Sequence, residues 1–211
     1  MAAELSSSWQ GEPTDILCFG FDPAPNALTP LAESIWRRQR ENIHDTYDAL
    51  LRQGYQFPRR REVLAASDGE PHQFDDLIAL LRAQGYEDIG GALRSGGFQW
   101  ITEDPAAIVE AAHQSGAVCL IAHPGRGDGF ACFDAPQLDR LRAAVEIDGL
   151  EVYHPSHTPE AAAAFLAYAR AHHLLVSAGS DSHGKPEQMP ITYRAEICRD
   201  LLERLGVAIR A

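Results

Sequence analysis

Three short apolar segments, each followed within a few residues by His or Asp, limit this chain to folds in which the ends of strands come together. The segments are 117–122 (AVCLIA), 149–153 (GLEVY) and 174–178 (LLVSA). His123 and His154 directly follow the first two segments, and His157, Asp181 and His183 lie in the loops that come after the second and third. Apolar runs of this length are typical of strands covered on both faces, and the carboxyl ends of such strands carry the chemistry in parallel α/β sheets and barrels. We therefore expect these side chains to form one site.

The last of these strand ends, read alone, fits two structures equally well. Asp181 and His183 lie in the Gly-bounded loop 179–184 and offer an oxygen and a nitrogen ligand side by side, which suits a catalytic metal. The same residues would also suit a polar turn with a solvated histidine. Two further strand ends of the same design favour the metal site. The remaining histidines on helical patterns are expected to be surface or packing residues, namely His44, His113, His172 and His173.

The order of expected elements indicates an α/β fold with a helical insertion. Strands are expected at 4–8, 16–21, 98–102, 117–122, 149–153 and 174–178. Helices are expected at 30–53, 62–66, 74–84, 105–115, 136–145, 159–172 and 194–205. Strands and helices alternate from residue 98 onward, which is typical of parallel strands with right-handed crossovers. We interpret 1–29 and 98–211 as the α/β core and 30–97 as the insertion.

The net charge and the spacing of the cysteines restrict the ligands and the cellular location that we expect for this chain. The formal net charge is −12, so a broad electrostatic grip on duplex nucleic acid is not expected, whereas a small phosphorylated ligand held by local cations is compatible. The segment 59–61 (RRR) is read as a solvated basic turn. No apolar run reaches membrane-spanning length, and the first fifteen residues lack the pattern of a signal peptide. The four cysteines show no C-x-x-C spacing, so free thiols and a cytoplasmic location are expected.

The motifs AHPGR (122–126), DGLEVYHPSHTPE (148–160) and GSDSHG (179–184) resemble those of the PHP (polymerase and histidinol phosphatase) metallophosphoesterases. The similarity is strongest to the branch with nucleotide phosphatases and 5′-to-3′ exoribonucleases. Weaker likenesses at 4–23 and at 69–72 (GEPH) extend it over most of the chain. The resemblance implies a distorted (β/α)7 barrel that holds up to three metal ions.

The resemblance also implies a set of metal ligands. Glu4 matches the family's bridging carboxylate, and His72 and His123 match the two histidines that share a metal with it. Asp181 and His183 match the ligands of the family's final motif, each serving a different metal of the cluster. The family begins with a strand that ends in His-x-His, and this sequence has no such motif. We therefore expect an N-terminally incomplete barrel that binds about one metal tightly, and a homodimer that covers the exposed sheet edge.

The activity implied by the resemblance is metal-dependent hydrolysis of a phosphomonoester or phosphodiester, in a nucleotide or at an RNA end. Asp181 is expected to orient or deprotonate the attacking water, and Arg126 to clamp a phosphate oxygen. His154 or His157 is expected to contact phosphate or protonate the leaving oxygen. The mixed nitrogen and oxygen ligands suit Mn, Fe or Zn. Two alternatives stay open: a non-catalytic metal- or phosphate-binding protein, and a metal-dependent amidohydrolase.

Overall fold

The computed structural model describes residues 1–24, 26–182 and 190–209. The chain divides into two compact units. The first unit combines Met1–Ala32 with Thr102–Ala211, and the second is Glu33–Ile101. Among the described residues, no helix is both long enough and apolar enough to cross a membrane.

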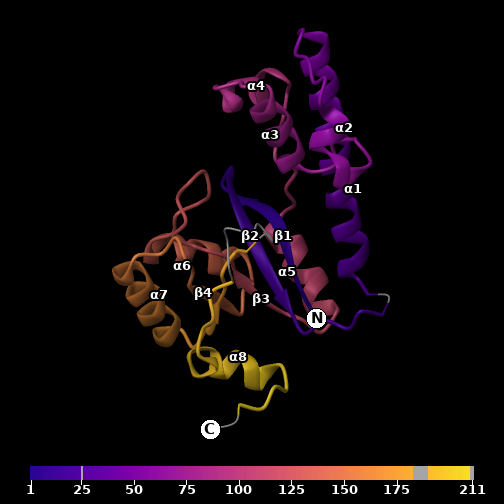
Figure 1. Cartoon of the computed structure of the whole chain (residues 1–211). Coiled ribbons are helices and arrows are strands. Elements are labelled where there is room, and N and C mark those ends of the chain that lie inside the picture. Colours follow the sequence, from indigo (N-terminus) through magenta and orange to yellow (C-terminus); the bar gives the residue numbers. More distant parts are fainter. Residues whose placement is uncertain (25, 183–189, 210–211) are drawn as a thin grey trace. The chain divides into compact units, whose positions relative to one another are not determined.

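A five-stranded mixed sheet organises the first unit (Figure 1). Its strands, in spatial order, are β1 (Ala2–Trp9), β2 (Glu12–Phe19), β3 (Val118–Ile121), β4 (Gly149–Tyr153) and β5 (Leu175–Ala178). The pairs β1–β2 and β2–β3 are antiparallel, whereas the pairs β3–β4 and β4–β5 are parallel. Gln10 and Gly11 both have positive φ, 53° and 88°, which is the two-residue turn that matches the twist of an antiparallel hairpin.

Helices cover both faces of this sheet. On one side, α5 (Pro105–Gln114) packs against β1, β2 and β3. On the other side, Val118 and Leu120 of β3 pack with Leu201 of α8 (Arg199–Arg204). The remaining helices of this unit are α6 (Ala135–Ala144), α7 (Pro159–Ala171) and the 3-10 turn η2 (Ala195–Cys198). Because the sheet is covered on both faces, the β3 side chains are all buried.

The second unit is helical. It contains most of α1 (Leu28–Arg52), together with α2 (Arg60–Val63), the 3-10 turn η1 (Ala65–Ser67), α3 (Phe74–Ala83) and α4 (Ile89–Ser95). Its core includes Ile43 and Leu50 of α1, which cluster with Leu77 and Leu81 of α3. This unit therefore has an apolar core of its own.

Two differences from the sequence-based expectations concern the region before α5. The expected strand at 98–102 is wrong: within it, Phe98 and Trp100 instead pack their rings against Phe74, with centroids 4.9 and 4.6 Å away. Glu103, three residues after Trp100, forms an isolated bridge to Ser7 of β1. The helix α4 was not expected. Among the described residues, β1 and β5 are the edge strands of the sheet. The seven-stranded barrel, its helical insertion and the homodimer remain predictions.

Candidate active site

Glu4, Asp15 and His123 converge at the edge of the sheet where β3 ends. Glu4 lies on β1 and Asp15 on β2, and His123 follows β3 by two residues. The Nε2 atom of His123 lies 3.3 Å from Glu4 Oε1 and 3.3 Å from Asp15 Oδ2. One imidazole nitrogen and two carboxylates from three strands therefore form a group of metal-ligand type.

The electrostatics of this group favour a positive charge at its centre. Burial alone would lower the pKa of His123, but the hydrogen bonds and charges of Asp15 and Glu4 overcome it and raise that pKa to about 9. Burial raises the pKa of Asp15, and the contact with His123 opposes that shift. The group therefore holds a proton on the imidazole in the space between two carboxylates.

Glu151 supports His123 from the neighbouring strand. The side chain of Glu151, in the middle of β4, is almost fully buried. Its Oε2 accepts the main-chain N–H of His123 at 2.8 Å. Burial raises the pKa of Glu151 to about 7. His123 has φ 29°, an uncommon value for a residue other than glycine, so this hydrogen bond stabilises a strained main chain.

The sequence interpretation missed both Asp15 and Glu151. Glu151 carried a usable signal, because it is a carboxylate within the apolar segment 149–153. Asp15 carried none that was specific. Only the pairing of β2 between β1 and β3 brings it next to His123.

A second set of side chains surrounds Asp181, which lies three residues after β5. Arg126 Nη1 lies 3.1 Å from Asp181 Oδ2, and His154 Nε2 lies 3.6 Å from the same oxygen. The Arg126 guanidinium also lies over the Phe130 ring, 4.4 Å from its centroid. The His123 and His154 rings are 5.3 Å apart, which makes the two sets neighbours.

The hydrogen bonds of His154 define its protonation. Its Nδ1 accepts the main-chain N–H of Ser156 at 3.2 Å, which places the proton of the neutral ring on Nε2. Burial, followed by the positive charge of His123, lowers the pKa of His154 to about 4. Within the described chain, the buried Nε2 has no hydrogen-bond partner. It is therefore a neutral donor available to a ligand.

His157 has a different environment. Its Nδ1 lies 2.9 Å from the carbonyl oxygen of Val152, and its Nε2 accepts the main-chain N–H of Gly125 at 3.0 Å. Both nitrogens therefore have protein partners. This side chain links the end of β4 to the loop that carries Arg126.

Two further residues, His72 and His183, were also expected to be ligands. His72 belongs to the helical unit, where its Nε2 lies 3.4 Å from Arg40 Nη2 and its ring 5.5 Å from that of His44. His183 lies outside the described residues. Their roles as ligands remain predictions.

Comparison with known proteins adds independent information. No family model matches the chain. A phosphoribosyl 1,2-cyclic phosphate 1,2-diphosphodiesterase from Eggerthella lenta is 25% identical over 194 residues, which cover 86% of this chain and 70% of that protein. The 5′-3′ exoribonuclease Rnm of Salmonella typhimurium and that of Escherichia coli are each 36% identical over 88 residues. Those residues cover 40% of this chain and 28% of either Rnm protein. The predicted resemblance to PHP-type phosphoesterases is confirmed.

Two solved structures share the fold of this chain. A protein assigned as a metal-dependent phosphoesterase from Bifidobacterium adolescentis superposes with a TM-score of 0.70 at 22% identity, covering 96% of this chain and 75% of that one. An amidohydrolase from Chromobacterium violaceum gives 0.73 at 23% identity and covers 96% and 76%. At this level of identity, the two likenesses establish the fold alone.

Proposed function

We propose that this chain is a metal-dependent phosphoesterase that hydrolyses a phosphoester of a nucleotide or of an RNA end. One observation carries the proposal. The metal-ligand group of Glu4, Asp15 and His123 lies beside Arg126, His154 and Asp181, all within one unit. Ligands for a cation and donors for an anion therefore lie side by side, as phosphoester hydrolysis requires.

The Glu4–Asp15–His123 group fits a divalent cation. The proton that His123 holds between two carboxylates marks a place where positive charge is favourable. One nitrogen and two oxygen donors suit Mn, Fe or Zn. When bound, such an ion supplies Lewis-acid activation of water and neutralises phosphoryl charge. Glu151 would hold the His123 main chain in place during the reaction.

The neighbouring side chains supply substrate contacts. Arg126 is oriented by the Phe130 ring and would donate two N–H groups to phosphate oxygens. His154 would donate from Nε2 to another phosphate oxygen, because its low pKa keeps the ring neutral at pH 7. Asp181 would accept a proton from the attacking water at Oδ2, the oxygen that faces Arg126 and His154. His157 positions the Arg126 loop.

The substrate class follows from charge and from the named relatives. A net charge of −12 disfavours binding along an extended stretch of nucleic acid. The expected ligand is therefore a single nucleotide or the end of one strand. The names of the relatives refer to a cyclic ribosyl phosphate and to RNA read from the 5′ side. Both are phosphodiesters of ribose. A substrate that contains a ribose phosphate fits all three observations.

A phosphoester-hydrolysis assay that resolves the products tests the proposal. The Mn²⁺-loaded chain should release phosphate from a mononucleotide, open a ribose cyclic phosphate to a ribose phosphomonoester, or release nucleotides from a 5′-phosphorylated RNA oligonucleotide. His123→Ala should abolish the activity, and His172→Ala, on the surface of the same unit, should not. Metal binding without hydrolysis of any phosphoester would favour the non-catalytic alternative. Hydrolysis of an amide substrate alone would favour the amidohydrolase.

A further inference from the structure

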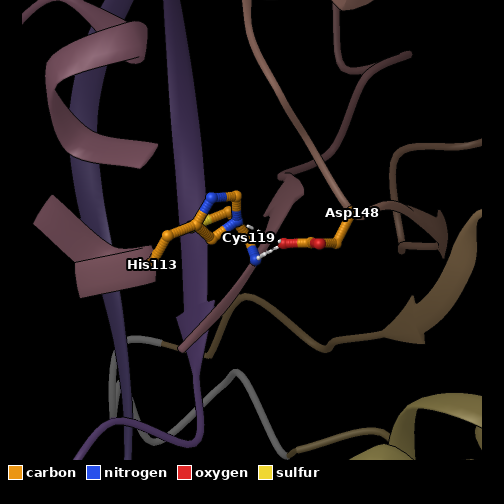
Figure 2. Close-up of side chains that lie close together, drawn as sticks. All are labelled: His113, Cys119 and Asp148. Carbon is orange, nitrogen blue, oxygen red and sulfur yellow. Dashed lines mark hydrogen bonds and ion pairs between the residues drawn. The ribbon is translucent and has the colours of Figure 1, made fainter. Parts of the chain in front are cut away.

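A second group of metal-ligand side chains lies at the opposite ends of the strands. It consists of His113, Cys119 and Asp148 (Figure 2). His113 is in the last turn of α5, Cys119 is the second residue of β3, and Asp148 directly precedes β4. The candidate active site lies at the carboxyl ends of these parallel strands, whereas the second group lies toward their amino ends.

The three side chains face one another. Ligand atoms of the imidazole, the thiol and the carboxylate all lie within 4.8 Å of one another. His113 Nε2 is 2.9 Å from Asp148 Oδ2, and the same oxygen accepts the main-chain N–H of Cys119 at 2.7 Å. Figure 2 shows the Asp148 carboxylate pointing toward both the His113 ring and Cys119. Three elements therefore bring nitrogen, sulfur and oxygen donors to one point.

The burial of these side chains suits a metal site that is open to solvent on one side only. Cys119 is fully buried, whereas the side chains of His113 and Asp148 are about one-third exposed, at 31% and 30%. An ion can therefore enter from solvent past the imidazole and the carboxylate and meet the thiol at the inner end. The hydrogen bond from Cys119 N–H holds the carboxylate in place, as the outer contacts of metal ligands do.

A neighbouring thiol extends the group. Cys18 pairs with Cys119 across β2 and β3, and their Sγ atoms are 3.9 Å apart. Two thiolates on one tetrahedral zinc ion, with bonds of about 2.3 Å, are separated by about 3.8 Å. The thiol pair therefore already has a spacing that zinc tolerates. The contact with Cys18, burial and the Asp148 charge all raise the pKa of Cys119, so the site lacks the positive charge that a thiolate needs.

We propose that His113, Cys119 and Asp148 form a second metal site, selective for a thiophilic divalent ion such as Zn²⁺. The fourth position is filled by water or by Cys18. The site uses sulfur, which the Glu4–Asp15–His123 group lacks, so the two sites differ in the metals that they prefer. It joins α5 to β3 and to the start of β4, and it stands apart from the proposed hydrolysis.

Cobalt tests this assignment without any activity measurement. Co²⁺ replaces Zn²⁺ and gives a thiolate-to-cobalt charge-transfer band in the near ultraviolet only when sulfur is a ligand. The reduced full chain should show this band when titrated with Co²⁺. Cys119→Ala should lose it. A Cys132→Ser, Cys198→Ser double variant should keep it, because the cysteines that it removes lie elsewhere, and so should His123→Ala.

A second variant guards against a folding defect in Cys119→Ala. His113→Ala changes a partly exposed residue and leaves the thiol in place. It should weaken Zn²⁺ binding at this site at least about 10-fold, measured by competition with a chromophoric chelator. The proposal would be overturned if the reduced chain showed no charge-transfer band, if the band survived in Cys119→Ala, or if His113→Ala bound Zn²⁺ as tightly as the parent. Asp148 would then serve only as the acceptor for His113 and the Cys119 main chain.

Discussion

The main-chain N–H of His123 donates a 2.8 Å hydrogen bond to the buried carboxylate of Glu151. This bond ties the loop after β3 to the middle of β4 and holds His123 at its positive φ. It also places a carboxyl group with a pKa of about 7 directly behind the candidate metal ligand. The stability of the metal-free protein should therefore depend on the proton at Glu151.

Glu151→Gln tests this dependence. The pKa of Glu151 is raised from 4.5 to about 7 on folding, so the parent loses stability as the pH rises from 4.5 through 7. The glutamine keeps an acceptor for His123 and does not titrate. Relative to the parent, the variant should gain up to about 3 kcal/mol in free energy of unfolding between pH 4.5 and 8. Urea unfolding of EDTA-treated protein at both pH values measures this gain, and a pH-independent difference would contradict the assignment.

Asp15→Ala tests the candidate metal centre. Removing one of two carboxylates that face His123 should weaken Mn²⁺ binding at least about 10-fold. Calorimetric titration measures the affinity. Asp139→Ala is the matched control, because it removes a carboxylate at the surface of the same unit, which contacts Tyr168 and His172. Equal Mn²⁺ affinity in parent and Asp15→Ala would remove Asp15 from the ligand set.

Asp181→Asn separates chemistry from substrate binding. If Asp181 takes the proton of the attacking water, the amide should lower kcat by on the order of 10²-fold or more with a small change in KM. Steady-state kinetics with the best substrate of the panel measures both constants. A variant that retains the full kcat would show that another group handles the water.

Arg126→Ala should mainly weaken the interaction with the phosphate group of the substrate. A charge-assisted hydrogen bond is worth about 1.5–3 kcal/mol, so kcat/KM should fall about 10- to 100-fold. Arg142→Ala removes an arginine that contacts Tyr168 instead, and it should leave kcat/KM unchanged. Similar losses in the two variants would mean that Arg126 acts through general charge and not through a specific contact.

Gly149→Ala tests how closely β4 and β5 approach. A Cβ at Gly149 would lie 2.4 Å from the Leu175 carbonyl oxygen. This oxygen belongs to the main chain of β5 and cannot move away as the end of a side chain could. We expect a loss of about 1–3 kcal/mol in free energy of unfolding. Gly90→Ala in α4 is the control, because its Cβ would meet only the end of the Arg94 side chain, at 3.2 Å, and alanine favours helix. Thermal or urea unfolding of both variants decides the matter.

Local patterns in the sequence were enough to place most strands and helices and the residues at strand ends. Apolar runs followed by His123, His154 and Asp181 predicted that these side chains gather at one edge, because parallel strands end on the same side of a sheet. The same patterns failed at 98–102, where Phe98 and Trp100 pack as rings with Phe74. An apolar run records burial, and a strand and an aromatic cluster bury such residues equally well.

Only the tertiary structure decided which polar groups share an environment. Asp15 comes next to His123 because β2 pairs with both β1 and β3, a register that single-strand patterns do not contain. The joining of His113, Cys119 and Asp148 depends on how α5 packs on the sheet. The sequence by itself determined the residue types, their burial and the likeness to PHP-type proteins. The distances between distant residues, and therefore the pKa values and ligand sets, arise only from packing, because electrostatic and ligand interactions depend on separation in space and not along the chain.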